Sequence, residues 1–416
     1  MPGALGLPAG SSPGTRVAIV EPVFRPSPER DMFRRRDFLI ATGVAGLGAC
    51  APGRPALGSP AAPRRWRPYR DALVMDAAGG LNLFFSEQLD PKTVVKLVAD
   101  ELAQARASGL TAVVTTVAPS GQFWLNDAAF EKTKAQLASF KAKIAAHPDV
   151  LLLVGSAADL DRARREKRLG VIFTFQGTES LGEDADRIPL FRQLGVRVIQ
   201  LTHNRRNLVG DGCMEPGNAG LSNYGHEVVA RLNGEKIVVD LAHGAQRTIR
   251  EGIAASKAPV LISHTGCRAL ADLPRNTADA ELRAMADRGG VAGIIFWPYL
   301  RVDTQPMAID VVRHIEHAIK VCGEDHVGLG TDASVGPVDR TAEFEKGNRE
   351  FVTDLVEQGI FARGRPRDLY MFIPDLNTAN RFEVLAAMLS ARGHGDARIA
   401  KILGGNFARV MREVWS

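Results

Sequence analysis

Two histidines stand at the ends of two consecutive strand-like segments. The apolar run at residues 237–239 leads to His243, and the run at residues 260–262 leads to His264. A buried strand that ends in a histidine directs an imidazole into whatever lies above the sheet. Two such strands in succession can aim two imidazoles at one point, which suits a metal ion or the activation of a water molecule.

Residues able to do chemistry follow most of the other strand-like segments as well. The carboxyl ends of the eight apolar runs hold Asp76, Thr116 to Ala118, Gln176, His203, His243, His264, Trp297 and Asp332. Each of these taken alone is best explained as a satisfied polar residue near a loop. Taken together, three histidines, two aspartates and a glutamine at strand ends indicate an active site.

The elements that must position these residues are strands alternating with helices. The apolar runs lie at residues 73–75, 112–117, 171–175, 196–201, 237–241, 260–262, 291–296 and 327–329, and amphipathic helical patterns such as residues 91–107 separate them. Continuous apolar strands that alternate with helices predict a parallel sheet covered on both faces. Eight of them predict an α/β fold of the (β/α)8 TIM-barrel type, like that of metal-dependent hydrolases, with catalytic groups at the carboxyl ends of the strands. A doubly wound open sheet is the alternative, and it would separate the first strand end from the last.

Length and charge set outer limits on the function. The chain has 416 residues, of which 45% are hydrophobic and 24% charged, as is usual for a globular protein. A single barrel can use this length. The formal net charge of +5 comes largely from N-terminal arginines between residues 16 and 70. We therefore predict no nucleic-acid-binding surface.

The N-terminus has the pattern of an export signal. Three consecutive arginines, Arg34 to Arg36, precede Phe38 and a run of small apolar residues at 41–49. This pattern predicts a twin-arginine signal and a periplasmic protein. Residues 47–50 resemble a lipoprotein cleavage site, so Cys50 is either lipidated, which would be the protein's one link to a membrane, or incidental. The expected organisation is an extension and signal at 1–50, a Pro/Ala-rich linker at 51–70 and the barrel at 71–416.

Other candidate residues carry weaker signals. His314 and His317 have helical spacing, but they are expected on the solvated face of an outer helix. Cys267 is better explained as a small buried residue than as a ligand or nucleophile. Arg205 and Arg206 either line the pocket or are surface charges.

Several motifs resemble the membrane (renal) dipeptidase family, peptidase family M19, and they occur in the family's order. The matching segments are residues 194–204, 220–225, 239–243, 259–265, 275–276, 328–332 and 402–410. The resemblance covers roughly residues 72–412. It implies a (β/α)8 barrel that holds two zinc ions bridged by a carboxylate and that cleaves dipeptides and related small amides. Because relatives are often dimers, it also makes a homodimer a candidate assembly.

The resemblance assigns roles residue by residue. His243 and His264 match the ligands of the second zinc ion. His203 matches a substrate-binding histidine that helps to polarise the scissile carbonyl, and Arg275 matches the arginine that holds the substrate carboxylate. Asp332 matches the acid that carries a proton between water and the leaving amine. The implied partner is a small peptide-like substrate with a free carboxylate.

Three positions depart from the family's pattern. Ala78 and Gly80 stand where the family has the histidine and aspartate of the first zinc, and Gln176 stands where it has the bridging glutamate. A methyl group and a hydrogen bind no metal, and a neutral amide is a poor bridge between two dications. We therefore expect at most one zinc ion. Asp76 and Glu179 could replace the lost ligands only if their loops shift.

Three functions stay open at this point. The first is an exported hydrolase in which His243 and His264, with Asp332 or Gln176, hold a single zinc ion. The second is a metal-free periplasmic enzyme that tailors peptides by acid–base chemistry. The third is a non-catalytic binding protein on the same barrel. In each case the glycines at residues 79–80 could leave room for a bulkier substrate.

Overall fold

A computed structural model describes residues 65–88, 90–118 and 127–416 of the chain. The predicted signal, Cys50 and most of the linker lie outside the described residues. The described end of the linker contains the 3-10 helix η1 (Arg67–Asp71), and Trp66 and Tyr69 are buried in the hydrophobic core. Within the described part, the helices are too short or too polar to cross a bilayer.

Eight parallel strands form the central sheet, in the order in which they occur along the chain. They are β1 (Met75–Asp76), β3 (Ala112–Thr116), β5 (Leu169–Gln176), β6 (Val196–Gln200), β7 (Val238–Asp240), β8 (Leu261–Thr265), β9 (Val291–Ile294) and β10 (Val327–Leu329). A ninth strand, β4 (Leu151–Leu153), pairs with β5 alongside this path. The backbone N–H of Ala77 donates to the carbonyl of Leu329 at 3.0 Å, which joins the first strand to the last. The predicted barrel is confirmed, and the doubly wound alternative is wrong.

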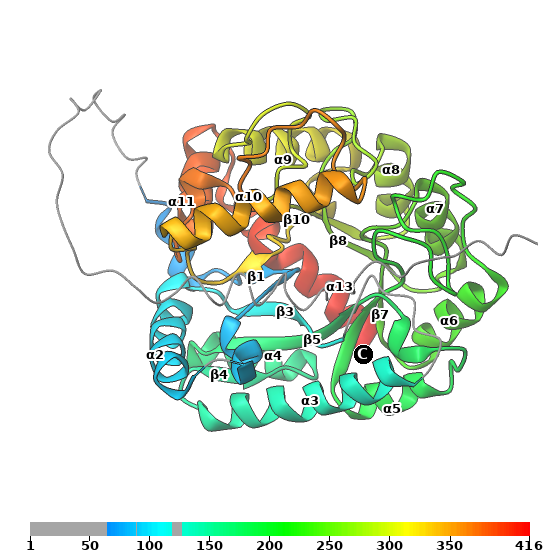
Figure 1. The fold of residues 1–416 in the computed structure, drawn as a ribbon, viewed down its shortest axis with the longest axis horizontal. Coiled ribbons are helices and arrows are strands. Elements are labelled where there is room, and N and C mark those ends of the chain that lie inside the picture. The colour runs from blue at the N-terminus through cyan, green and yellow to red at the C-terminus, as the bar shows by residue number, and fades with distance from the viewer. Residues whose placement is uncertain (1–64, 89, 119–126) are drawn as a thin grey trace, which may run out of the picture.

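Helices surround the strands, as the ring of coiled ribbons in Figure 1 shows. They are α2 (Pro91–Ser108), α3 (Ala128–Ala146), α4 (Ala157–Glu166), α5 (Arg187–Gln193), α6 (Asn223–Gly234), α7 (Gln246–Ala255), α8 (Asp279–Asp287), α9 (Ala308–Cys322), α10 (Ala342–Glu357), α11 (Arg381–Ala391), α12 (Asp396–Ala400) and α13 (Asn406–Trp415). Sequence signals start several of them. The Asp90 side chain accepts from the N–H groups of Lys92 and Thr93 at the start of α2, and Ser222 accepts from Gly225 at the start of α6.

The final helix, α13, packs against the strands on the inside of the barrel, and Figure 1 shows it crossing the ring of strands. Its Phe407 is fully buried and belongs to the same hydrophobic cluster as strand residues such as Ala112 and Leu261. A Cβ atom on Gly328 would lie 2.2 Å from the Phe407 ring, so β10 carries glycine where the aromatic side chain packs. This packing explains why residue 328 is a glycine.

A two-stranded parallel pair lies near the junction of the first and last strands. It consists of β2 (Gly79–Gly80) and β11 (Ala333–Ser334), with Ala333 opposite Gly79 and Ser334 opposite Gly80. Each strand of the pair directly follows a barrel strand, β1 or β10. The pair therefore sits at the carboxyl-end face of the barrel, where catalytic groups of this fold gather.

Candidate active site

The structure brings His243, His264 and Asp332 together at this face. One ligand atom from each of the three lies within 4.8 Å of the others, and the two imidazole Nε2 atoms are 2.9 Å apart. We refer to these three residues as the His–Asp cluster. Among the described residues they are the one group of three or more His, Cys, Asp or Glu side chains placed to share a metal ion.

His243 is held in a specific orientation by the loop that follows β6. Its Nδ1 lies 2.8 Å from Oδ1 of Asn204, and an amide oxygen can only accept. Nδ1 therefore carries a proton, so that in the neutral form of the ring Nε2 would present its lone pair to the cluster. The backbone of His243 has a positive φ of 63°, and its carbonyl accepts from the N–H of Cys213. A non-glycine residue held in this region is typical of functional sites.

His264 is a neutral imidazole in the same cluster. It is fully buried, and its Nδ1 lies 2.8 Å from the hydroxyl of Ser263. Burial lowers the pKa of His264 well below the ordinary value, and the charges of Arg275 and His203 lower it further. A neutral imidazole is the form that binds a metal ion. The 2.9 Å between the two Nε2 atoms also fits a direct hydrogen bond between the rings.

His203 lies against one imidazole of the His–Asp cluster, and Asp332 supplies the carboxylate of the cluster. The ring of His203 stacks on that of His243, with centroids 4.3 Å apart. Asp332 also has a positive φ, 54°, and its backbone is fixed twice: its N–H donates to Ala78 O at 2.6 Å, and its carbonyl accepts from Trp297 Nε1 at 2.7 Å. The amide of Gln176 reaches the Asp332 carboxylate only at 3.5 Å. The side chains of His203 and Asp332 are both half-buried and are therefore accessible to a substrate.

Arg275 is a buried cation without a hydrogen-bond partner among the described residues. The residue is 4% exposed, and all three guanidinium nitrogens lack a bond to that part of the chain. Its guanidinium lies 5.8 Å from the centroid of the Tyr299 ring. The neighbouring Asn276 fixes the loop, because its amide donates to Tyr299 O at 2.8 Å and its Oδ1 accepts from Gly266 N at 3.1 Å. An unsatisfied buried guanidinium is costly, so this site indicates an anionic ligand.

The positions that the resemblance assigns to the first zinc ion offer no replacement ligand. Asp76 is buried and accepts hydrogen bonds from the N–H and hydroxyl of Thr331 and from the N–H of Ala78. Burial raises the pKa of Asp76 to about 6. This carboxyl links the ends of β1 and β10 and is not part of the His–Asp cluster. Glu179 lies against Gly177, where a Cβ atom would be 2.2 Å from its Oε2, and it does not join the cluster either.

One expectation from the sequence is wrong. His314 does not lie on a solvated face: it is 1% exposed, its Nδ1 accepts from Cys267 N at 2.9 Å and its Nε2 donates to Leu300 O at 3.0 Å. Helix α9 packs against α8 and β10, so this part of its surface belongs to the interior. His317 is half-buried and contacts Asp279. Cys267 is fully buried, as expected.

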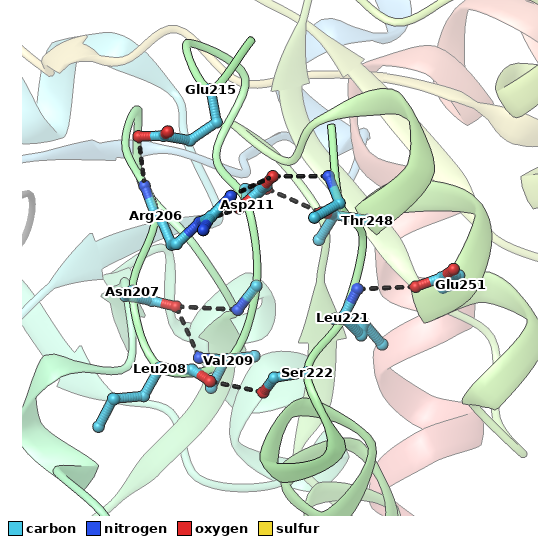
Figure 2. A network of polar contacts seen from close by, with 12 residues as sticks. Arg206, Asn207, Leu208, Val209, Asp211, Glu215, Leu221, Ser222, Thr248 and Glu251 are labelled. Atoms are coloured by element: carbon cyan, nitrogen blue, oxygen red, sulfur yellow. Dashed lines mark hydrogen bonds and ion pairs between the residues drawn. The ribbon is translucent and has the colours of Figure 1, made fainter. Parts of the chain in front are cut away.

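The 22-residue loop between β6 and α6 carries both His203 and Asn204, and its own polar groups fold it (Figure 2). Asn207 Oδ1 accepts from the N–H groups of Val209 and Gly210, and Arg206 pairs with Asp211 at 2.6 Å. The loop is tied to α7, because Thr248 donates to Asp211 O and Leu221 N donates to Glu251. Arg205 and Arg206 are exposed, so they are surface charges and do not line the cluster.

Sequence reasoning did not identify the contacts of Asn204 and Trp297 with the site. The sequence marks Trp297 only as the end of a strand, and Asn204 only as part of a family motif. The one available signal was that Asn204 directly follows a candidate catalytic histidine.

Comparisons with known proteins agree with this fold. The family model of membrane dipeptidases (peptidase family M19) matches residues 71–360. A Klebsiella pneumoniae protein, described as an uncharacterized protein in the pqqA 5' region, is 30% identical over 291 residues, which are 67% of this chain and 95% of that protein. Dipeptidase tcpJ of Claviceps purpurea is 26% identical over 321 residues, which are 75% of this chain and 68% of tcpJ. An amidohydrolase structure from Pseudomonas aeruginosa has a TM-score of 0.70 at 28% identity, over 84% of this chain and 98% of that one. The family match spans every strand of the barrel.

Proposed function

Because the chain belongs to the membrane dipeptidase family, peptidase family M19, we propose that it hydrolyses a dipeptide or small peptide-like amide with one zinc ion at most. The observation that carries this proposal is the combination of the His–Asp cluster with the unpartnered guanidinium of Arg275. A carboxylate on Arg275 satisfies the buried cation and fixes one end of the substrate. The amide that is to be cleaved then lies next to the cluster.

The donor set fits one metal ion and does not fit two. His243 and His264 present imidazole nitrogens 2.9 Å apart, with the Asp332 carboxylate in reach. A zinc ion held by these residues would supply Lewis-acid polarisation of the substrate carbonyl. The first-zinc positions hold a methyl group, a hydrogen and a neutral amide at Ala78, Gly80 and Gln176, which offer no anionic ligand.

The protein's own residues account for binding and proton transfer. Arg275 holds the substrate carboxylate, and His203 donates to the carbonyl oxygen of the scissile amide. As water adds to the carbonyl carbon, Asp332 accepts the water's proton. When the carbon–nitrogen bond breaks, Asp332 gives that proton to the leaving amine, so that it starts and ends the reaction as a carboxylate.

A second candidate function is a metal-free peptide-tailoring enzyme. It is favoured by the direct contact between His243 Nε2 and His264 Nε2 at 2.9 Å, which one shared proton satisfies as a hydrogen bond. In that case the same residues do acid–base chemistry without a Lewis acid. A non-catalytic binding protein would keep only the carboxylate site at Arg275.

Metal content and turnover decide between these functions. We expect about one zinc ion per chain in protein purified without chelator. Asp332→Asn should lower kcat on dipeptides by about 100- to 10,000-fold and leave the unfolding transition unchanged. An absence of zinc, together with turnover that a chelator does not reduce, would support the metal-free enzyme. Two zinc ions would contradict the reduced centre, and wild-type turnover in Asp332→Asn would remove Asp332 from the mechanism.

We propose in addition that the protein is exported to the periplasm. The support is the sequence of Arg34 to Arg36 with the apolar run behind it. Replacing Arg34 and Arg35 together by lysine should retain the protein in the cytoplasm, as cell fractionation would show. Cys50→Ala should move it from the membrane fraction to the soluble periplasm if Cys50 is lipidated, and should change nothing if it is not.

A further inference from the structure

A cavity of about 90 Å³ lies beside the His–Asp cluster. One wall is the β2–β11 pair, and the opposite wall is formed by the ends of β3 and β5. Its lining includes Asp332, which the cavity shares with the cluster, and Gly80 and Gln176, which are two of the three first-zinc positions. Because a water molecule accounts for about 30 Å³ in the liquid, the cavity has room for a short side chain.

Gly80 lines the cavity without a side chain, and packing does not require a glycine there. A Cβ atom on Gly80 would meet Thr115 at 3.7 Å, which is ordinary contact, and Gly80 does not have a positive φ. Gly79 is different, since a Cβ atom on it would lie 2.7 Å from the Asp76 carboxylate. The geometry of β2 therefore explains the glycine at residue 79 and leaves the one at residue 80 unexplained by the fold.

The cavity wall carries hydrogen-bonding groups that are mostly uncharged. The Thr115 hydroxyl belongs to a residue that is 1% exposed, and it has no hydrogen-bond partner among the described residues. It lies 4.0 Å from the position of a Cβ atom on Gly80. Ser334 donates to Asn82 at 2.8 Å, and the Gln176 amide completes this polar surface. A buried hydroxyl without a partner costs free energy, so this wall suits a ligand that offers a hydrogen bond.

The cavity lies across the barrel from Arg275. Arg275 follows β8, which is the sixth strand of the ring, and the cavity lies at the end of β3, which is the second. In a ring of eight, these strands are opposite one another. The His–Asp cluster is connected to both, because Asp332 also lines the cavity and His264 is on β8, the strand that Arg275 follows. A substrate with its carboxylate on Arg275 and its amide at the cluster therefore extends its amino-terminal residue towards the cavity.

We propose that this cavity is the subsite for the side chain of the substrate's amino-terminal residue, and that it selects short hydrogen-bonding side chains such as the hydroxyl of serine or the carboxamide of asparagine. The subsite occupies the space left by the missing ligands of the first zinc ion. The inference rests on the proposed dipeptide hydrolysis and adds the class of substrate.

The test compares kcat/KM for Ser-Gly, Asn-Gly, Ala-Gly and Leu-Gly on the full-length protein. We expect Ser-Gly and Asn-Gly to exceed Leu-Gly by about tenfold or more. Thr115→Val keeps the shape and removes the hydroxyl, so it should reduce the preference for Ser-Gly over Ala-Gly by about fivefold, and Thr115→Ser should restore it. Gly80→Val fills the cavity and should lower the ratio of Asn-Gly to Ala-Gly turnover by about tenfold.

Gly234→Ala is the matched control, because a Cβ atom on this glycine of α6 meets nothing within 4 Å. It should leave every ratio unchanged. Protection against heat unfolding by each dipeptide is measured in parallel, because it requires no turnover. If no dipeptide is cleaved, the hydrolase proposal fails. The order in which the dipeptides protect against heat unfolding then still shows whether the cavity selects hydrogen-bonding side chains. Equal ratios for the four dipeptides in rate and in protection, unaffected by Thr115→Val and Gly80→Val, would overturn the subsite.

Discussion

Arg275 combines deep burial with full charge and has no hydrogen-bond acceptor in the described chain. Such a group lowers the stability of the free protein and gains its partner only on binding. Burial raises the pKa of the nearby Asp240, and the charge of Arg275 counteracts part of that rise, so attraction between the two groups offsets part of this cost. A residue kept under these conditions is better explained by ligand binding than by folding.

We predict that Arg275→Met will stabilise the protein and impair catalysis. Methionine has a similar length and removes the buried charge, so the free energy of unfolding should rise by about 1 kcal/mol or more. The kcat/KM for a dipeptide should fall by about 100-fold, because the substrate carboxylate loses its partner. Denaturant unfolding and kinetics on a dipeptide and its carboxamide measure both effects. A less stable variant that still prefers the free carboxylate would contradict this role.

Asn204 acts through His243, since its amide oxygen fixes which ring nitrogen carries the proton. Asn204→Ala should therefore weaken zinc binding by about 10- to 100-fold, as titration against a competing chelator would show. Arg205→Ala is the control, because it removes an exposed side chain next to Asn204 that bonds to Gln358 O and touches no imidazole. Equal zinc affinity in wild type and Asn204→Ala would exclude this positioning role.

At the scale of elements, the two ends of the barrel divide the work. At the carboxyl-end face, where His243 and Asp332 meet, both of these residues have a positive φ and follow β7 or β10. Away from this face, α13 packs against the strands, and its Phe407 contacts Gly328 and Gly293. Substitutions in the α13 packing should therefore change stability, while those at the carboxyl-end face should change activity.

A double-mutant cycle tests this packing. Gly328→Ala places a Cβ atom against the Phe407 ring and should cost about 1–3 kcal/mol. Phe407→Leu alone should cost a similar amount through the cavity it leaves. Because the smaller side chain relieves the overlap, the double variant should lose clearly less than the sum of the two single losses. Additive losses in denaturant unfolding would show that the two residues do not share this space.

The barrel itself could be predicted because its strands are continuous apolar runs, which can be recognised in the sequence without knowledge of tertiary contacts. The pair β2–β11 could not, since Gly79–Gly80 and Ala333–Ser334 have no strand propensity and pair only because β1 and β10 bring them together. The same holds within the site. The residues at strand ends, such as His243 and Asp332, could be found from spacing, whereas the contact of Asn204 depends on a long loop folded by its own side chains.

On the scale of the whole molecule, one buried acid links an outer helix to the segment behind the cavity. Glu101 of α2 is 3% exposed, and its carboxylate accepts from the N–H groups of Asn82 and Leu83 at 2.8 and 2.7 Å. These residues begin η2 (Asn82–Gln88), directly after β2. The charged form of Glu101 is therefore hydrogen-bonded but strongly desolvated.

Burial raises the pKa of Glu101 from an ordinary 4.5 to about 7. Between these two values the folded protein binds more protons than the unfolded chain, so stability falls as pH rises through this window. The full effect is of the order of 3 kcal/mol. Asp76 acts in the same direction at lower pH, since burial raises its pKa to about 6. Buried imidazoles such as His264, whose pKa burial lowers, act in the opposite direction below about pH 6.5. We therefore predict that urea unfolding at pH 5, 6, 7 and 8 will show the decline as the difference between the wild type and Glu101→Gln, which cannot ionise. A difference that does not change from pH 5 to 8 would show that the titration of Glu101 does not contribute to the pH dependence of stability.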